Sequence, residues 1–313
     1  METICLGRTG LTVSVMGLGC GGHSRLGIRT GHTEAEAERV VKEALALGVN
    51  FIDTAEGYKT EEIVGRALRG TDRGQVVLST KAGVHWQERY ATAAEMKERV
   101  EACLRRLQTD HVDVFHLHGV SVDDYPYGLQ ELLPALQECQ REGKIRFIGI
   151  TEAFGPDPTH KMLMRALEDD CWDVMMVGFN ILNQSARERV LLHTRQRNIG
   201  TLCMFAVRRA LSRPDALRQL MGELAAQNLV DADAFDPEDP LGFLVEEGAA
   251  SSLPEAAYRF CRWEPGMDVI LSGTGDVAHL QTNAASLTLP ALPPQHIARL
   301  QRLFARVDSV SGN

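Results

Sequence analysis

The strongest constraint on the fold is a series of eight short β-rich runs whose ends recur at nearly regular distances. These runs are 13–19, 51–53, 76–81, 113–118, 145–151, 174–180, 200–206 and 268–273. Successive ends lie 26 to 37 residues apart, except the last two, which are 67 residues apart. Amphipathic helical segments fall between the runs. Strands that alternate with helices predict a parallel sheet, and eight such units predict one α/β domain over residues 1–313, a (β/α)8 TIM barrel. A doubly wound sheet is the alternative.

The segments between the runs carry helix signals. Helices are predicted at 33–47, 93–107, 129–142, 159–169, 185–197 and 253–263. The first begins with Thr33 and has Glu36 three residues later, the pattern of a capping box. Before the barrel, the turn Arg8-Thr9-Gly10 between two extended runs predicts an N-terminal β-hairpin. The long interval after strand seven, 207–252, predicts an insertion with its own helix at 214–228, which is a candidate lid over the barrel.

Composition excludes several classes of protein. The formal net charge is -9, and the stretch 219–258 holds nine acidic residues and no Lys or Arg. An acidic chain without a basic run is a poor nucleic-acid binder. No apolar run reaches the roughly 20 residues of a membrane helix. The N-terminus resembles no signal peptide, and seven scattered Cys without a CxxC pair suit a reducing compartment, so a cytoplasmic location is expected.

Four ionisable side chains stand at or just beyond the ends of neighbouring predicted strands. Asp53 ends the second strand, Lys81 the third and His118 the fourth, while Tyr58 follows on the loop after Asp53. Taken singly, each has an ordinary explanation as a turn, surface or structural residue. In a barrel, however, the C-terminal ends of the strands meet at one mouth, where active sites lie. The four together therefore predict a site.

This set of side chains suits the addition of hydride to a carbonyl. A tyrosine with a pKa of about 10 is a reluctant proton donor, and a neighbouring ammonium such as that of Lys81 would make Tyr58 a better acid. Asp53 would pair with a buried Lys81, because a buried ammonium needs a partner. His118 would orient the substrate oxygen. No metal is needed in this scheme, and the hydride must come from a cofactor.

Longer stretches carry a resemblance to a known family. They are GVNFIDTAEGY (48–58), EEIVGRAL (61–68), VVLSTKAG (76–83), DHVDVFHLHG (110–119), GKIRFIGIT (143–151), FN (179–180) and SGTGDVAHLQTN (272–283). In this order they resemble the aldo-keto reductase superfamily. The resemblance implies a barrel oxidoreductase that transfers hydride between NAD(P)H and the carbonyl of a small aldehyde or ketone. It implies the tetrad Asp53, Tyr58, Lys81 and His118, and NADPH as the cofactor, with NADH as the alternative.

Two glycine-bearing segments are expected to hold this cofactor. Barrels commonly bind phosphate after strands seven and eight, and SGTG at 272–275 offers backbone N–H groups and a following helix N-terminus. The resemblance extends this site to 283 and places a second segment, 19–21, beside the nicotinamide. The predicted residues are Gly19, Cys20, Gly21, Ser272, Gly273, Thr274, Gly275, His279 and Asn283.

The chain departs from the family at other cofactor positions. Thr151-Glu152 replaces a serine and an asparagine, Met176 replaces a glutamine, and Phe205-Ala206-Val207-Arg208 replaces an aromatic residue and Ser-Pro-Leu. We expect Phe205 to stack on the nicotinamide. We expect Glu152 to accept a hydrogen bond from its amide and Arg208 to meet the pyrophosphate.

Loop residues extend these expectations to substrate and cofactor selection. Trp86 is expected to form a wall of the substrate pocket. If 207–252 covers the mouth, its acidity should disfavour anionic substrates. Gly275 stands where the family often has an arginine for the 2′-phosphate of NADPH, so this position supplies no cation.

Two other functions compete with carbonyl reduction. His116 and His118 share one strand face, and such a pair occurs in metal-dependent barrel hydrolases. The departures from the family at the nicotinamide positions also fit a regulatory protein that binds the cofactor and catalyses little turnover. We expect no metal site, because no third His ends a strand.

Overall fold

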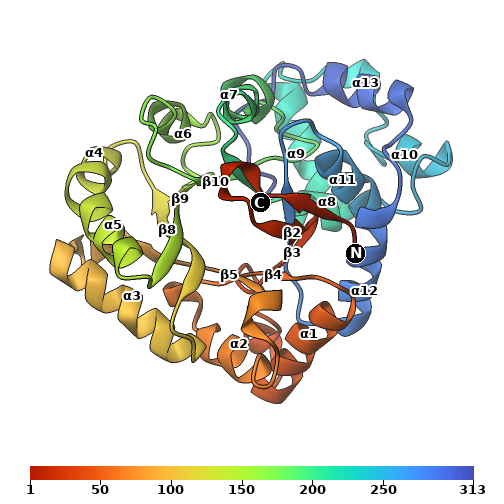
Figure 1. Cartoon of the computed structure of the whole chain (residues 1–313). Coiled ribbons are helices and arrows are strands. Elements are labelled where there is room, and N and C mark those ends of the chain that lie inside the picture. The colour runs from red at the N-terminus through yellow and green to blue at the C-terminus, as the bar shows by residue number, and fades with distance from the viewer.

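A computed structural model describes residues 1–313 and has an eight-stranded parallel barrel at its centre (Figure 1). The barrel strands are β3 (Met16–Gly19), β4 (Phe51–Asp53), β5 (Val77–Gly83), β8 (Val112–Val120), β9 (Ile145–Glu152), β10 (Val174–Gly178), β11 (Gly200–Met204) and β12 (Val269–Ser272). Each pairs in parallel with the next strand along the chain, and β12 pairs with β3 to close the ring. The predicted (β/α)8 barrel is confirmed, and the doubly wound alternative is wrong.

Helices surround the barrel. They are α1 (Glu34–Ala46), α2 (Glu61–Ala67), α3 (Ala93–Leu107), α4 (Tyr125–Tyr127), α5 (Leu133–Arg141), α6 (Lys161–Ala166), α7 (Leu192–Gln196), α11 (Leu253–Arg262), α12 (Val277–Thr288) and α13 (Pro294–Leu303). The predicted capping box at Thr33 and Glu36 is present, and Thr92 and Glu95 form a second one before α3. In each, a threonine hydroxyl and a glutamate satisfy backbone N–H groups that a helix start leaves free.

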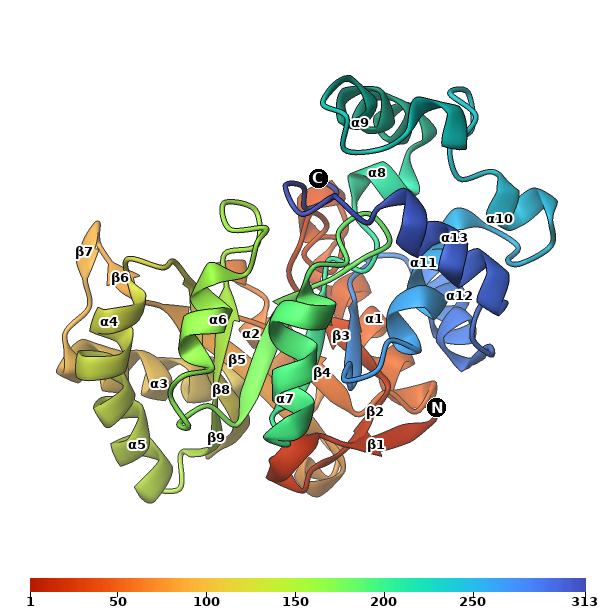
Figure 2. The ribbon, with the colours of Figure 1, turned by 90° about the horizontal axis from the view of Figure 1, so that it is seen from above.

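The N-terminal hairpin closes the lower end of the barrel. Its strands, β1 (Thr3–Cys5) and β2 (Thr12–Ser14), pair antiparallel as predicted. Leu6, Leu11 and Val13 of this region belong to a small apolar core inside the barrel that is separate from the larger core between strands and helices. Figure 2 shows the hairpin at the opposite end from α8, α9 and the C-terminus. The open end of the barrel is therefore the end at which the C-terminal ends of the strands lie.

Several predicted boundaries were wrong. The run 13–19 contains two elements, because 12–14 pairs in the hairpin and only 16–19 enters the barrel. The helix predicted at 129–142 starts earlier, with α4, which runs directly into a π-helical turn at 128–132, and the helix predicted at 185–197 contains a π-helical turn at 187–191. The helix predicted from 159 begins at 161, because His160 before it adopts a left-handed conformation with φ of 62°. Periodicity locates such helices but does not show how their first turns are hydrogen-bonded.

The insertion after strand seven carries its own helices. These are α8 (Arg209–Ser212), α9 (Pro214–Ala226) and α10 (Phe243–Glu246). The helix predicted at 214–228 thus corresponds to α9, with Pro214 at its first position, where the missing N–H of proline costs nothing. Figure 2 shows α8 and α9 beside the C-terminus at the open end of the barrel.

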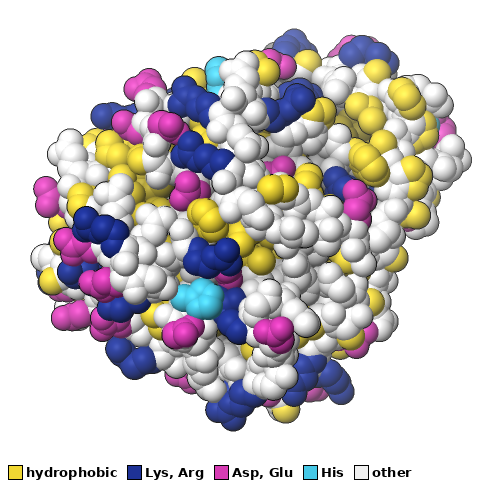
Figure 3. Space-filling view, viewed as in Figure 1, with side chains coloured by type: hydrophobic (Ala, Val, Ile, Leu, Met, Phe, Trp, Pro, Cys, Tyr) yellow, Lys and Arg dark blue, Asp and Glu magenta, His cyan; other side chains and the backbone are white.

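Charges of both signs are interspersed on the hairpin face of the molecule, which Figure 3 shows in the view of Figure 1. This face has no area in which Lys and Arg alone gather. None of the helices is both long and apolar enough to cross a lipid bilayer.

Candidate active site

The four side chains predicted from the strand ends do meet at the barrel mouth. Asp53 is the last residue of β4, and Tyr58 ends the short 3₁₀ turn Glu56–Tyr58 that follows it. Lys81 and His118 lie in β5 and β8, which continue two residues beyond each of them. The parallel register, which pairs Asp53 with Ser79 in β5, sets these side chains at similar heights on neighbouring strands.

Lys81 and Asp53 form a fully buried ion pair. Lys81 Nζ lies 2.7 Å from Asp53 Oδ1 and 2.6 Å from Oδ2, and it also donates to the backbone oxygen of Thr54 at 2.8 Å. Burial opposes the charge of Lys81, but the Asp53 carboxylate and Tyr58 outweigh it, and the pKa of Lys81 is raised. The ammonium therefore stays charged at neutral pH, and its three N–H groups are all bonded.

Tyr58 lies between this ammonium and an imidazole. Its hydroxyl is 3.4 Å from His118 Nε2, and Lys81 Nζ lies 5.2 Å from the centre of its ring. Burial raises the pKa of Tyr58, and the Lys81 ammonium opposes this shift without cancelling it. Lys81 thus acts to lower the pKa of the phenol, as expected, but the increase caused by burial is larger. A Cβ at Gly21 would lie 2.4 Å from the Tyr58 ring, so only glycine leaves room for the tyrosine there.

His118 is a neutral group. Burial, together with the charges of Lys81 and Arg99, lowers its pKa to about 3. A neutral imidazole has one N–H to donate and one nitrogen to accept. Next to the Tyr58 hydroxyl it can therefore hydrogen-bond a polar oxygen without adding charge.

A cavity of about 970 Å³ begins at two of these groups and follows the mouth of the barrel, and Lys81 and His118 are not among the residues that line it. Asp53 and Tyr58 lie at one part of it, and Gly273 and Thr274, after β12, at another. The predicted cofactor residues that line it are Gly19, Gly21, Met176, Phe205, Arg208, Gly273, Thr274 and His279. The structure thus joins the strand-end site and the glycine segment in one cavity.

Arg208 crosses this cavity without an acidic partner. Its guanidinium stacks on the Phe205 ring at 4.0 Å, and Nε donates to Asn313 Oδ1 at 2.7 Å. No Asp or Glu carboxylate lies within 4 Å of it, whereas 14 of the 27 arginines of the chain have such a partner. A partly buried cation without a counter-ion favours an anion beside it.

Two predicted nicotinamide residues lie outside the lining. Thr151 Oγ1 accepts a hydrogen bond from the backbone N–H of Gly119. Glu152 is buried, with His160 Nδ1 3.0 and 2.9 Å from its two oxygens, and it accepts from the backbone N–H of Gly178 at 2.7 Å. Burial raises the pKa of Glu152 despite these bonds. Both carboxylate oxygens are therefore engaged inside the protein, and the expected bond to the nicotinamide amide finds no free acceptor.

Three more predicted residues lie behind the lining. Cys20 is completely buried. Asn283 donates to Ser272 Oγ at 3.0 Å, and this hydroxyl lies 2.9 Å from the hydroxyl of Tyr258. Tyr258, which the sequence did not predict, is the member of this network that lines the cavity.

Gly275 is closely covered by another loop. A Cβ built at Gly275 would lie 2.2 Å from the Cα atom of Gly27. A larger residue at this position would therefore displace the loop around Gly27. The backbone of Gly27 approaches position 275 so closely that glycine is required there, and an arginine would not fit without a shift of this loop.

Trp86 is placed differently from the prediction. It lies in the short hairpin of β6 (His85–Trp86) and β7 (Arg89–Tyr90), and it does not line the cavity. Its ring stacks on Arg99, 4.8 Å from the guanidinium carbon, and Arg99 pairs with Glu56. We find no support here for Trp86 as a pocket wall.

The insertion lines the cavity with basic residues. Its contribution is Val207, Arg208, Arg209, Ser212 and Arg213, and no acidic residue of 219–258 takes part. The lining therefore gives no support to the expectation that the acidic stretch disfavours anionic substrates, and that expectation stays a prediction. The cluster of arginines directly after strand seven was visible in the sequence and could have indicated this basic wall.

The two histidines of the predicted metal alternative point to different partners. His116 Nε2 lies 3.1 Å from Ser79 Oγ in the barrel interior, whereas His118 lies against Tyr58. Nowhere in the chain do three or more His, Cys, Asp or Glu side chains gather in a way that could hold a metal ion. The donor set that a metal-dependent hydrolase needs is not assembled.

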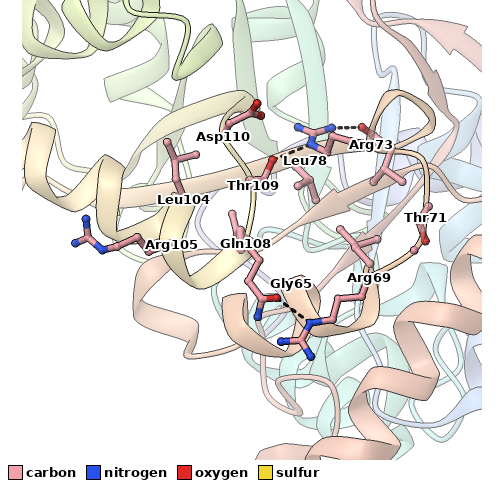
Figure 4. Close-up of a pocket in the computed structure, with 14 residues that line it drawn as sticks. Gly65, Arg69, Thr71, Arg73, Leu78, Leu104, Arg105, Gln108, Thr109 and Asp110 are labelled. Carbon is pink, nitrogen blue, oxygen red and sulfur yellow. Dashed lines mark hydrogen bonds between the residues drawn. The ribbon is translucent and has the colours of Figure 1, made fainter.

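A second cavity, of about 660 Å³, lies between the C-terminal ends of α2 and α3 (Figure 4). Arg69 donates to Gln108 there, and Arg73 is bonded to Asp113, while Arg105 points away from the other labelled residues. The C-terminal ends of helices carry partial negative charge, which these basic residues offset. No Tyr, His or Lys side chain lines this cavity, so the mouth remains the candidate active site.

Comparisons with known proteins agree with this geometry. The model of the Aldo/keto reductase family matches residues 16–305. The chain is 27% identical over 306 residues to an uncharacterized oxidoreductase, YqkF, of Bacillus subtilis, covering 95% of this chain and 94% of that protein. It is 31% identical over 209 residues to the NADH-specific methylglyoxal reductase of Escherichia coli, covering 61% and 63% of the two chains. The holo structure of aldo-keto reductase AKR11C1 from Bacillus halodurans is similar, with 25% identity, a TM-score of 0.73 and coverage of 98% and 97%.

Proposed function

The chain belongs to the aldo-keto reductase family and is an NAD(P)-dependent oxidoreductase, and we propose that it reduces the carbonyl of a small aldehyde or ketone with Tyr58 as the proton donor. The observation that supports this role is the position of the Tyr58 hydroxyl, 3.4 Å from a neutral imidazole, with the Lys81 ammonium 5.2 Å from its ring. A phenol beside an imidazole and an ammonium in one largely buried site can donate a proton to an oxygen that gains negative charge.

The residues of the mouth fit a nicotinamide dinucleotide. Gly19, Gly21 and Gly273 line the cavity, and a Cβ at Gly273 would lie 2.9 Å from the backbone oxygen of Gly19. The unpaired Arg208 offers a cation to a pyrophosphate, and Phe205 offers an aromatic face. When bound, the cofactor supplies the hydride. We propose NADPH, with NADH as the alternative to be tested; His279 is one of the ionisable side chains that line the cavity.

In this mechanism each side chain has one task. His118 Nε2 holds the carbonyl oxygen of the substrate by a hydrogen bond, and Tyr58 Oη transfers its proton to that oxygen as the negative charge develops. Lys81 stabilises the phenolate that remains, through space, because its N–H groups are bonded to Asp53 and Thr54. Asp53 keeps the ammonium charged and in place.

The direct test is an assay of the purified protein with a panel of neutral and anionic aldehydes and ketones. NADPH and NADH are supplied separately, and loss of nicotinamide absorbance is followed, with substrate omitted as the control. Turnover of at least one carbonyl compound is expected. Tight cofactor binding without turnover of any compound would instead favour the regulatory alternative.

The role of Arg208 can be measured without turnover. Arg208→Ala should weaken cofactor binding by about 10- to 100-fold, because a hydrogen bond to a charged group contributes about 1.5–3 kcal/mol. The measurement is a fluorescence titration with NADPH. Arg141→Ala, which removes an exposed arginine from α5, is the control and should bind normally. An unchanged dissociation constant for Arg208→Ala would remove Arg208 from the cofactor site.

A further inference from the structure

Beneath the catalytic groups the barrel interior carries a polar layer. Barrel interiors are usually filled by bulky apolar side chains, and the lowest layer here, with Val77 and Val114, follows that rule. Two residues further along their strands, the inward positions hold Asp53, Ser79 and His116, none of them more than 3% exposed. This layer lies directly below Lys81 in the barrel, so its hydrogen bonds bear on the site above.

Space for the imidazole of His116 comes from the next strand. Gly149 of β9 pairs with His116 of β8, and a Cβ at Gly149 would lie only 2.2 Å from His116 Nδ1. Any larger residue at Gly149 would push the ring away. In the position that Gly149 allows, His116 Nε2 lies 3.1 Å from Ser79 Oγ.

The direction of the hydrogen bonds follows from the donors available. Ser79 Oγ lies 2.8 Å from Asp53 Oδ1, and an ionised carboxylate can only accept, so the serine proton points to Asp53. Ser79 Oγ must then accept from His116, which places the proton of the neutral imidazole on Nε2. His116 Nδ1 is buried without a partner, as expected for the unprotonated nitrogen. Burial lowers the pKa of His116 well below its ordinary value, which keeps the ring neutral.

We propose that Ser79 and His116 form an internal relay of hydrogen bonds that holds the Asp53 carboxylate in the orientation required by Lys81. They are positioning residues: neither touches the cavity, and both act through Asp53. The proposal rests on the proposed catalytic role of Tyr58, because its effect on turnover is transmitted to that residue.

The relay is expected to affect catalysis because hydrogen bonds fix the position of the Lys81 ammonium. All three N–H groups of Lys81 are bonded, two of them to Asp53, so a rotation of the carboxylate moves the positive charge relative to the Tyr58 ring. Ser79 supplies the one bond to Asp53 Oδ1 that does not come from Lys81. Without that bond the carboxylate is held on one side only. A small displacement of a catalytic charge can lower the rate substantially.

The first test compares kcat and KM for single variants that fold normally. Ser79→Ala and His116→Leu should lower kcat about 10- to 100-fold, while KM for the cofactor stays near the wild-type value, because neither residue lines the cavity. His116→Gln, which can place an amide N–H near the position of Nε2, should recover much of the lost rate. Thr194→Val is the matched control: it removes a buried hydroxyl of α7 that is bonded only to the backbone oxygen of Leu191, and kcat should not change.

The double variant Ser79→Ala/His116→Leu separates a relay from two independent contributions. If His116 acts through Ser79, the double variant should lose no more than the worse single variant. Additive losses would overturn the relay. Unchanged kcat in a folded Ser79→Ala protein would overturn the proposal as a whole.

A spectroscopic arm does not depend on turnover. Nitrogen-15 NMR of histidine-labelled protein should show His116 as a neutral Nε2–H tautomer between about pH 5 and 9, with a signal that shifts in Ser79→Ala. An Nδ1–H tautomer, or a His116 signal indifferent to Ser79, would overturn the hydrogen-bond direction. If the wild-type protein reduced no carbonyl, the proposed function would fail, and this arm would still decide whether the relay exists. The NMR measurement also tests the relay if the His116→Leu protein does not fold.

Discussion

Tyr58→Phe should lower kcat for carbonyl reduction by about 10²–10⁴-fold, the range typical of a positioned general acid. The substitution removes only the hydroxyl, and the ring keeps its contacts with Gly21 and His118. Cofactor binding, measured by fluorescence titration, should therefore be unchanged. Tyr90→Phe is the matched control, because Tyr90 is an exposed tyrosine that stacks on Tyr127 away from the cavity. A Tyr58→Phe protein with near wild-type turnover would rule out the phenol as the donor.

The pKa shifts of Tyr58 and His118 also predict how the turnover of the wild-type protein depends on pH. The raised pKa of Tyr58 keeps the phenol protonated through neutral and mildly alkaline pH, and the pKa of about 3 keeps His118 neutral above acidic pH. Wild-type kcat/KM for reduction should therefore be nearly constant between about pH 5 and 9, since neither group changes its charge in that window. A steep limb near pH 6.5 would contradict a neutral His118.

Lys81→Met should lower the free energy of unfolding by about 3–5 kcal/mol and also abolish most turnover. The stability loss is expected because the Asp53 carboxylate would be left buried with no cation. Urea unfolding measures the change. The matched control is Lys97→Met, which breaks an exposed pair with Glu138 and should cost no more than about 1 kcal/mol.

A double variant distinguishes stability from catalysis at this pair. Asp53→Asn/Lys81→Met removes both charges, so it should regain most of the stability lost in Lys81→Met. It should remain inactive, because no ammonium is left to stabilise the phenolate of Tyr58. Recovery of turnover in the double variant would show that Lys81 serves only the fold.

The main features of the fold could be predicted because they repeat. Eight strand ends at similar intervals specify a barrel, and a threonine followed by a glutamate at the capping-box spacing specifies the start of α1. The convergence of Asp53, Lys81 and His118 follows from the same rule, because parallel strands end on one side. Tyr58 is brought to them by a turn only a few residues long.

The errors arise from side-chain direction and from contacts between distant segments. Thr151 and Glu152 are adjacent in one strand, so they point to opposite faces and cannot both reach the mouth. The partner that takes Glu152, His160, lies in a left-handed conformation that no periodic pattern indicates. Trp86 was misplaced because its partner, Arg99, comes from α3, and a contact between distant segments is not encoded in local spacing.

The closed lower end of the barrel has a consequence for turnover. Leu6, Leu11 and Val13 fill that end, and Lys81 has no unbonded N–H with which to restore a lost proton to Tyr58. After each reduction, we expect the proton that re-forms the phenol to enter from bulk water through the open mouth, on the side where the alcohol departs. Reprotonation and product escape share one route, so a ligand that lingers at the rim would delay both.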